Sequence, residues 1–291
     1  MTRNVSNYFK EKVVVISGGA SGIGKALAEQ LATHKSYVVL LDRDIAAAQS
    51  FCQDLQNAGA NACAYALDVR DREAFTLCIQ QVLERYKRID VMINNAGIAI
   101  GGPAFEYSPE DWKYIVDVNL NGVIHGIDAV YGIMRKQGFG QIVNTASVVA
   151  LFPNVLTISY SCTKAAVHSL SMTLRLEAKN FGIKVNSLCP GAVDTPILLG
   201  GQFGRISHGV SKAMLQRYWK KMQPMSAERF AHLALIGISK NRACIILPKW
   251  WHCFVWSYRL CVPIWLRYSN KMLQKFFRAR EKSATSATGG L

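Results

Sequence analysis

The stretch that decides the fold is "VVVISGGASGIGKALAEQLAT", residues 13–33. Its opening run, 13–17, is rich in β-branched side chains and is typical of a buried parallel strand. Glycines follow this run immediately, and the residues after them have apolar side chains at helical spacing. We therefore expect a strand, a tight turn and a helix, which together form the repeating unit of an α/β sheet.

The alternation of strand-like runs with helical stretches continues along the chain. A helix over 44–59, for example, follows the second strand-like run and ends at a glycine. This pattern predicts an α/β fold, namely a Rossmann-type doubly wound parallel sheet of about seven strands with helices on both faces. The predicted strands are 13–17, 37–42, 62–69, 89–97, 140–147, 182–191 and 243–248.

The glycines of "SGGASGIG" (17–24) favour a phosphate-binding turn. Gly18 permits a sharp turn, while Gly22 and Gly24 let the backbone approach a pyrophosphate and let the helix pack closely on the strand. The N-terminus of the following helix would face the anion. A tight turn without a ligand is the alternative, but it does not need three glycines at these spacings.

Asp42 ends the second predicted strand, 18 residues after Gly24. A carboxylate there can accept hydrogen bonds from the adenosine ribose and would repel a 2′-phosphate, which favours NAD over NADP. The nearby cations Lys25 and Arg43 weaken this preference. Asp42 could instead cap the next helix, although Asp44 is equally suited to that role.

A second group of residues has the pattern of a proton-transfer site. Tyr160 and Lys164 lie four apart in a predicted helix and so share a face. Ser147 comes thirteen residues before Tyr160, at the end of a strand, where open α/β sheets bind ligands. An ammonium near a phenol favours the phenolate, which could then act as a base. Pairs at this spacing are also common on ordinary helix surfaces, so the pair alone is weak evidence.

Several motifs in a fixed order make the case stronger. The sequence resembles the short-chain dehydrogenase/reductase family, NAD(P)-dependent oxidoreductases, over roughly residues 10–248. The motifs that match are "SGGASGIG" (17–24), "LDV" (67–69), "NNAG" (94–97), "VDVNLNG" (116–122), Ser147, "YSCTK" (160–164) and "PGAVDTP" (190–196).

The resemblance implies a role for each matching residue. Tyr160 would be the general acid/base, Lys164 would lower the pKa of Tyr160 and hold the nicotinamide ribose, and Ser147 would bind the substrate oxygen. Asn119 would hold a proton-relay water beside Lys164. The expected catalytic set is Asn119, Ser147, Tyr160 and Lys164. The expected cofactor-binding set is Gly18, Ser21, Gly22, Ile23, Gly24, Asp42, Asp68, Val69, Asn95, Tyr160, Lys164, Pro190, Gly191, Val193 and Thr195.

These assignments divide the chain into three parts. Residues 1–248 are predicted to form the dinucleotide-binding catalytic domain, 249–282 an amphipathic helical extension, and 283–291 a disordered tail. Within the domain, 197–225 reads as a substrate lid with three loop glycines and an apolar helix face, although a plain surface helix would look the same. The residues of that face are Met214, Leu215, Tyr218 and Met222. We expect His208 to be a solvated loop residue.

Composition limits the remaining possibilities. The eight cysteines are scattered without a CxxC pair, so neither a zinc site nor a disulfide framework is expected, and the thiols should be reduced. No apolar segment precedes the first strand, so no signal peptide is predicted and a cytoplasmic location is expected. The net charge is +15, and eight basic residues against one acidic residue lie within 249–282. This local excess suggests a polyanionic neighbour.

We therefore expect an NAD-dependent enzyme that interconverts a hydrophobic alcohol, such as a lipid, steroid or retinoid, and its carbonyl. The alternative is a non-catalytic dinucleotide sensor or scaffold on the same fold. The complete set of four catalytic residues argues against the alternative. The resemblance also implies a homodimer or homotetramer paired through long helices at about 103–137 and 157–181.

The basic extension contains four of the six tryptophans. Pro263 divides it into two predicted helices, about 250–262 and 264–278, neither long and uncharged enough to span a bilayer. Tryptophans on one side and basic residues on the other suit peripheral membrane contact through 249–278. Nucleic acid is not favoured, because the cations alternate with large aliphatic side chains. The alternative is that both helices cover the substrate pocket or a dimer contact.

Overall fold

The computed structural model describes residues 2–206 and 212–288. At its centre lies a seven-stranded sheet in the order β11-β7-β6-β4-β1-β2-β3, with every neighbouring pair parallel. This confirms the predicted fold class. The strands are β1 (Val13–Ser17), β2 (Tyr37–Asp42), β3 (Asn61–Ala66), β4 (Val91–Asn94), β6 (Gly140–Thr145), β7 (Ile183–Pro190) and β11 (Cys244–Leu247).

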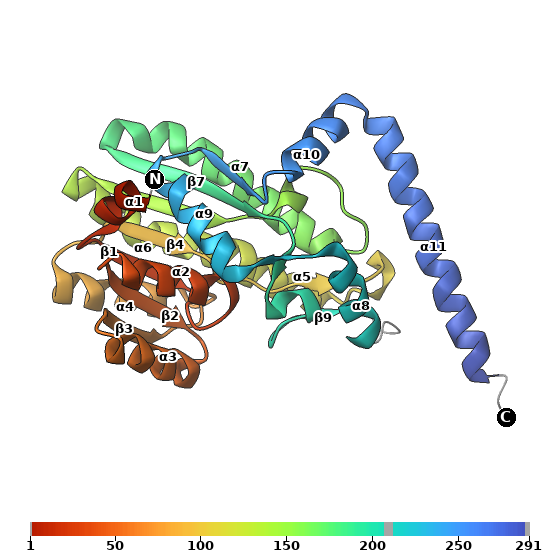
Figure 1. Ribbon diagram of the computed structural model, residues 1–291, viewed down its shortest axis with the longest axis horizontal. Coiled ribbons are helices and arrows are strands. Elements are labelled where there is room, and N and C mark those ends of the chain that lie inside the picture. The colour runs from red at the N-terminus through yellow and green to blue at the C-terminus, as the bar shows by residue number, and fades with distance from the viewer. Residues whose placement is uncertain (1, 207–211, 289–291) are drawn as a thin grey trace.

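Helices cover both faces of the sheet, as Figure 1 shows. One apolar core lies between the sheet and the first group of helices, and a second lies on the opposite face. The first group is α1 (Thr2–Phe9), α2 (Gly22–Thr33), α3 (Ile45–Asn57) and α9 (Ala227–Ser239). The second group is α4 (Arg72–Tyr86), α5 (Pro109–Val116), α6 (Gly122–Gln137) and α7 (Ile158–Ala178).

Two strands, β3 and β4, end three residues earlier than the sequence predicts. β3 ends at Ala66, because the chain turns at Asp68, whose carboxylate accepts a hydrogen bond from the Arg70 amide. β4 ends at Asn94 rather than at residue 97. Asn95 instead donates hydrogen bonds from its backbone and side-chain amides to Ser17, the last residue of β1, so the chain leaves the sheet there. In both cases a polar side chain, and not a loss of apolar residues, stops the strand.

Some elements have no clear sequence signal. Helix α1 buries Val5 and Phe9 in the first core. Two small parallel pairs, β5 (Ile100–Gly101) with β9 (Arg205–Ile206) and β8 (Val193–Asp194) with β10 (Met225–Ser226), lie beyond the main sheet. Such two-residue strands form only because tertiary contacts bring distant loops together.

The helical run predicted over 103–137 is interrupted. A 3₁₀ turn η1 (Ala104–Glu106) precedes α5, and a π-helical segment η2 (Asp117–Asn121) joins α5 to α6. One-turn π segments are rare and often lie at functional sites. The second predicted run, 157–181, is present as α7 followed by the 3₁₀ turn η4 (Lys179–Phe181).

The C-terminal extension forms two helices, α10 (Trp251–Leu260) and α11 (Val262–Thr288), with Pro263 near the start of the second, as predicted. Figure 1 shows α11 as a long rod at one end of the molecule. It continues through 283–288, where the sequence analysis predicts a disordered tail. Extending an existing helix needs no new nucleation, so weak helix formers can continue it. Within the described ranges, no helix is long and apolar enough to cross a bilayer.

Candidate active site

The glycine loop after β1 has the conformation that its residues predict. Gly18 and Gly22 have φ angles of 64° and 51°, which side chains other than glycine rarely adopt. A Cβ at Gly24 would lie 2.0 Å from the Gly18 carbonyl oxygen, so only glycine fits there. Ser21 stands at the N-cap of α2, and its side chain makes no capping bond. The loop therefore brings bare backbone to the N-terminus of α2, which is the geometry that an anion requires.

Asp42 faces this loop from the end of β2. Its carboxylate accepts hydrogen bonds from the Ala20 amide at 2.9 Å and from the Asp44 amide at 3.0 Å. Asp44, and not Asp42, caps α3 by accepting a bond from the Ala47 amide. The carboxylate of Asp42 is therefore held beside the glycine loop, where it can meet a ribose.

Arg43, the neighbouring cation, is already engaged by protein groups. Its guanidinium lies 3.6 Å from the centre of the Phe203 ring and 3.7 Å from the Asp68 carboxylate, and it donates to the Tyr114 hydroxyl. Arg70 forms a closer ion pair with Asp68, at 2.6 Å. The hydrogen bond from Arg70 lowers the pKa of Asp68 below its usual value. Arg43 is thus one of several charges in a network and not a free phosphate ligand.

Asn95 acts as a brace for the glycine loop. Its side-chain amide donates to the backbone carbonyls of Ser17 and Gly18, both at 3.2 Å, and its backbone amide donates to the Ser17 hydroxyl. Val69 is buried against Gly122, where an added Cβ would approach within 2.7 Å. Both residues therefore shape the cleft, and Asn95 does so by fixing the backbone of the loop.

The other wall of the cleft comes from the segment 190–195. Thr195 approaches Gly22 closely enough that a Cβ there would make van der Waals contact with it at 3.4 Å. Val193, in β8, is buried in the first core. Two loops whose contacting residues, Gly22 and Thr195, are 173 residues apart in the sequence thus face each other across the carboxyl end of the sheet. Because this is where open α/β sheets bind dinucleotides, the residues present fit an NAD(P) molecule.

The four predicted catalytic residues converge at the same end of the sheet. Lys164 is 2% exposed, and its Nζ donates to the Thr145 carbonyl at 2.8 Å and lies 5.7 Å from the centre of the Tyr160 ring. Asn119, in the π segment, is fully buried. A Cβ at Gly97 would lie 3.3 Å from both the Asn119 carbonyl oxygen and the Lys164 ammonium, so these two groups meet at this glycine.

The π segment explains how Asn119 reaches this position. Its side-chain oxygen accepts a bond from the Ile98 amide at 2.8 Å, and its amide group donates to the Ile98 carbonyl and to the Thr163 hydroxyl. The residue therefore links the loop after β4 to α7. The wider π turn places the side chain in the interior, which a regular helical pattern does not reveal.

Ser147 follows β6 and caps the 3₁₀ turn η3 (Val148–Ala150). Its hydroxyl donates to the Pro190 carbonyl at 3.3 Å and accepts from the Val149 amide at 3.4 Å. These long bonds hold the hydroxyl between η3 and the end of β7. A further hydrogen bond between Ser147 and Tyr160 lowers the pKa of the phenol, but the opposite effect of burial on this pKa is larger.

Burial dominates the electrostatics of the site in the protein alone. Burial raises the pKa of Tyr160 to about 12, and it lowers the pKa of Lys164 to about 8. The resemblance implies that Lys164 lowers the pKa of Tyr160. In the protein alone the removal of water around the phenolate is the largest contribution to this pKa, and the Lys164 ammonium donates to the Thr145 carbonyl. Tyr160 is therefore a phenol in the protein alone, which is the form that can donate a proton.

Aromatic side chains from the C-terminal extension complete one wall of the site. Trp251 stacks on Phe152 with ring centres 5.7 Å apart, and Trp265 lies 6.1 Å from the same ring. The Trp251 indole also packs on Gly191, where an added Cβ would lie 1.9 Å from its Nε1. This Nε1 is buried without a hydrogen-bond partner among the described residues. The sequence analysis missed this wall, because Phe152 and Trp251 are 99 residues apart and have no spacing signal.

The predicted lid has short structured pieces: the 3₁₀ turn η5 (Pro196–Leu199), β9 and helix α8 (Lys212–Met222). Trp219 donates from its indole to the Leu198 carbonyl at 2.8 Å, so α8 is fastened to η5. Of the predicted apolar face, Leu215 is partly buried and Met222 is 36% exposed. The side chains of Met214 and Tyr218, together with all of His208, lie outside the described residues.

Comparison with known proteins agrees with this geometry. The profile of the short chain dehydrogenase family matches residues 12–200. An uncharacterized oxidoreductase of Staphylococcus epidermidis is 34% identical over 67% of this chain and 84% of its own length. A 3-oxoacyl-[acyl-carrier-protein] reductase of Thermotoga maritima is 34% identical over 64% of this chain and 76% of its own.

A solved short-chain dehydrogenase/reductase from Burkholderia phymatum in complex with NAD superposes with a TM-score of 0.79. It is 29% identical and covers 88% of this chain and 95% of its own. This chain belongs to the short-chain dehydrogenase family. It is an NAD(P)-dependent oxidoreductase that acts on the CH–OH group of an alcohol or on the corresponding carbonyl.

Proposed function

We propose that this protein interconverts a hydrophobic alcohol and its carbonyl, with NAD as the preferred cofactor. The observation that carries the substrate class is the aromatic wall of Phe152, Trp251 and Trp265 next to the Ser147 loop. Aromatic surfaces beside a polar reacting centre suit a substrate that is apolar apart from one oxygen. A lipid-, steroid- or retinoid-like alcohol has this character.

In this proposal each polar group of the site has one task. Tyr160 donates its hydroxyl proton to the substrate oxygen in carbonyl reduction and accepts it back in alcohol oxidation. Ser147 binds the same oxygen, and Lys164 holds the nicotinamide ribose with its ammonium. Asn119 positions a water beside Lys164 so that the proton lost by Tyr160 is replaced. A bound nicotinamide supplies or accepts the hydride.

The preference for NAD rests on Asp42. Its fixed carboxylate lies where the adenosine ribose of a dinucleotide would meet the end of β2, and it would repel a 2′-phosphate. Arg43 interacts with Phe203, Asp68 and Tyr114, so its positive charge is not free to bind a 2′-phosphate and offset the repulsion from Asp42. In the proposed contacts, Asp68 and Val69 flank the adenine. The segment Pro190, Gly191, Val193 and Thr195 contacts the nicotinamide end, and the loop residues Gly18, Ser21, Gly22, Ile23, Gly24 and Asn95 surround the phosphates.

The C-terminal extension supports a second part of the proposal, peripheral contact with an anionic membrane. Its inner face packs on the protein, since Val255 is buried and Trp251 is partly buried. Its outer face leaves large apolar side chains in water, which are Trp256, Leu260, Ile264 and Leu266, exposed by 59%, 77%, 63% and 51%. Apolar side chains bordered by cations suit a helix that lies in a membrane interface.

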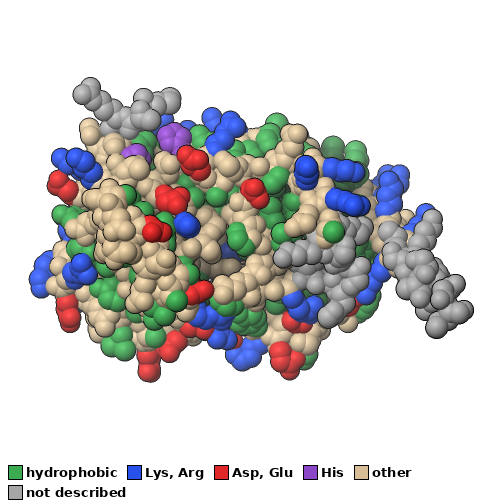
Figure 2. Space-filling model, turned by 60° about the horizontal axis from the view of Figure 1, so that its bottom comes forward, with side chains coloured by type: hydrophobic (Ala, Val, Ile, Leu, Met, Phe, Trp, Pro, Cys, Tyr) green, Lys and Arg blue, Asp and Glu red, His purple; other side chains and the backbone are tan. Residues whose placement is uncertain are grey.

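A nucleic acid fits this protein surface less well than an anionic membrane does. Figure 2 shows basic side chains interspersed with acidic ones on the face it presents, without a continuous basic surface there. A nucleic-acid groove combines such a surface with exposed stacking rings. In the extension, Trp251 and Trp265 instead pack on Phe152.

We also propose that the chain forms a homodimer or homotetramer through α6 and α7. Both helices expose large apolar side chains, among them Ile124 in α6 and Leu176 in α7, which is 75% exposed. Sedimentation of the purified protein measures the state. A Leu176→Glu variant should shift it toward the monomer, and a wild-type monomer would contradict this part of the proposal.

A substrate screen tests the central proposal. Purified protein is incubated with hydrophobic alcohols and NAD, or with the matching ketones and NADH, and nicotinamide absorbance is followed. The same panel is repeated with the phosphorylated cofactors. We expect turnover to increase with the apolar surface of the substrate and to be greater with NAD. Turnover confined to small polar alcohols would contradict the proposed substrate class.

A further inference from the structure

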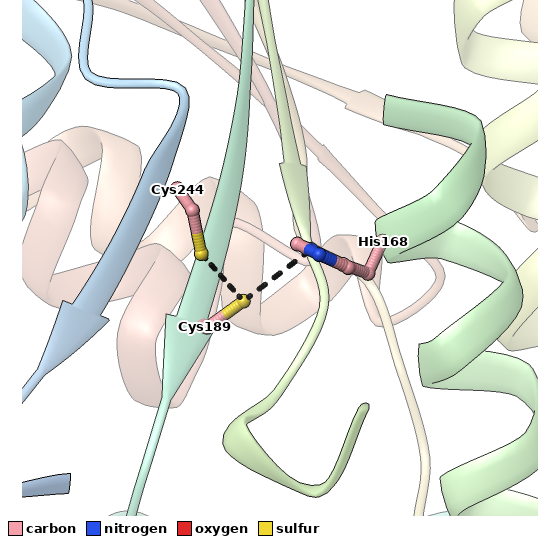
Figure 3. Close-up of side chains that lie close together, drawn as sticks. All are labelled: His168, Cys189 and Cys244. Carbon is pink, nitrogen blue, oxygen red and sulfur yellow. Dashed lines mark hydrogen bonds between the residues drawn. The ribbon is translucent and has the colours of Figure 1, made fainter. Parts of the chain in front are cut away.

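Three side chains with soft metal-binding atoms meet behind the active site. They are His168 from α7, Cys189 from β7 and Cys244 from β11, as Figure 3 shows. The two sulfur atoms are 3.7 Å apart, and the Cys189 sulfur is 4.0 Å from the His168 Nδ1. All three donor atoms lie within 4.8 Å of one another.

These separations are close to those of a tetrahedral zinc site. Zn–S bonds of about 2.3 Å at the tetrahedral angle place two sulfurs about 3.8 Å apart. The sulfur–sulfur distance already matches this value, and the distance from the Cys189 sulfur to the His168 nitrogen requires a closure of a few tenths of an ångström. The third pair, Cys244 and His168, lies within 4.8 Å, and rotation of the His168 side chain would have to close it further. We propose that His168, Cys189 and Cys244 form a binding site for one thiophilic divalent cation of the zinc type.

The surroundings suit such a cation. Cys189 is fully buried, whereas His168 and Cys244 are partly exposed, so an ion has a route from solvent. The His168 Nδ1 shares a hydrogen bond with the Ser187 hydroxyl at 2.9 Å. This hydrogen bond must break before the nitrogen can bind a cation. The three ligands come from one helix and two paired strands, so a bound ion would join elements that are 55 residues apart.

Two of the three side chains, His168 and Cys244, have pKa shifts that favour metal binding beside this geometry. Burial and the nearby Arg259 lower the pKa of His168, so the ring is neutral and can act as a ligand near pH 7. The hydrogen bond between the Cys244 and Cys189 sulfurs lowers the pKa of the Cys244 thiol, and Arg259 adds to this, whereas the same bond and burial raise the pKa of the Cys189 thiol. Two thiols and a neutral imidazole would bind one divalent cation and release two protons to water. Two thiolates then balance the charge of the cation.

The site adjoins the catalytic residues without being part of them. His168 lies one helical turn after Lys164 on α7, and Cys189 directly precedes Pro190, whose carbonyl accepts the Ser147 bond. Cys244 begins the strand that leads to α10. A bound ion would therefore link β11, the strand that leads to α10 and Trp251, to α7, the helix that carries Tyr160.

Cobalt titration of the full-length protein tests the proposal. The protein is kept reduced with a phosphine, and Co²⁺ binding is read from the visible bands of tetrahedral thiolate coordination. Displacement by Zn²⁺ then gives the zinc affinity. We expect one ion per chain, and binding at least tenfold weaker in Cys244→Ser and in His168→Gln. Both positions are partly exposed, so these variants should fold, which circular dichroism checks. Cys253→Ser, which removes an exposed thiol of α10, is the matched control and should bind like the wild type.

Thermal unfolding provides an independent measurement. Because a ligand of the folded state stabilises it by mass action, Zn²⁺ should raise the melting temperature of the wild type and of Cys253→Ser, but not of the two ligand variants. Equal binding in all four proteins, or loss of binding in Cys253→Ser alone, would place the ion elsewhere and overturn the proposal. A wild-type protein that shows no tetrahedral cobalt spectrum would also overturn it.

Discussion

Tyr160 is a partly buried phenol whose pKa is raised to about 12 by the loss of solvent around the charged form. Tyr160→Phe keeps the ring and removes the group that we propose transfers the proton. Turnover should fall by a factor on the order of 10² or more, while cofactor binding is largely retained. Steady-state rates and nucleotide-binding fluorescence measure the two quantities.

A matched control for this variant is Tyr131→Phe, because Tyr131 lies on α6 against Phe181. That change should leave turnover near the wild-type value. Near-normal turnover in Tyr160→Phe itself, with the substrate found in the screen, would show that another group transfers the proton.

Asp42 combines two functions in one carboxylate, since it fixes the glycine loop and lies where the cofactor ribose would meet β2. Asp42→Ala should weaken NAD binding by roughly tenfold and reduce the discrimination against NADP, because an acceptor and a repulsive charge are both lost. The ratio of kcat/KM for the two cofactors measures this change.

The neighbouring carboxylate offers the control. Asp44→Ala removes the cap of α3 and a long hydrogen bond from Gln202, so it should lower stability by about 1 kcal/mol and leave the cofactor ratio unchanged. A wild-type protein that prefers NADP would contradict the NAD proposal, as would a cofactor ratio that responds equally to both substitutions.

Among the elements, β9 is tied to the first turn of α5 by an ion pair. Arg205 donates two hydrogen bonds to the Asp111 carboxylate, and this interaction lowers the pKa of Asp111 to about 2. A carboxyl whose pKa is depressed stabilises the fold above its ordinary pKa near 3.8, and that contribution disappears as the pH falls toward 2.

Asp111→Asn should therefore lower the free energy of unfolding by about 1 kcal/mol at pH 7, after allowance for screening at this partly exposed site. The difference from the wild type should shrink between pH 4 and pH 2, as measured by urea unfolding across that range. Asp128→Asn is the control, because its ion pair with Arg72 is exposed and should contribute little. A difference that stays constant down to pH 2 would exclude the ion pair as its cause.

On the scale of the whole molecule, the C-terminal extension has an inner face that packs on Phe152 and Gly191 and an outer face that exposes apolar side chains. We expect the full-length protein to float with anionic liposomes at low salt and to dissociate as salt increases. Leu260→Ser combined with Ile264→Ser changes only exposed side chains and should remove most of the flotation. Protein that stays with the soluble fraction at low salt would contradict membrane contact.

A second comparison separates the two faces. Trp251→Phe changes the inner face and removes the unpaired indole N–H beside Gly191. It should leave flotation unchanged and raise the KM for the substrate without affecting that for the cofactor. If Trp251→Phe instead changes the flotation, the inner face of the extension is not packed on the protein in solution.

The sequence by itself determined the α/β fold, because apolar runs and glycine spacing are local signals. The strand over 13–17 and the glycines at 18, 22 and 24 have the predicted conformation. Motif order likewise indicated the family, which the comparisons confirm. The roles of the individual site residues and the oligomeric state remain predictions, since they depend on ligands and partner chains.

Only the tertiary structure revealed the features that depend on contacts between residues far apart in the sequence. The π turn at Asn119, the packing of Trp251 on Gly191 and the cluster of His168, Cys189 and Cys244 have no local spacing that announces them. The same holds for the pKa of Tyr160, which burial raises in the protein alone. The physical reason is that burial and charge proximity are properties of the folded chain, whereas periodicity and backbone freedom are already present in the unfolded one.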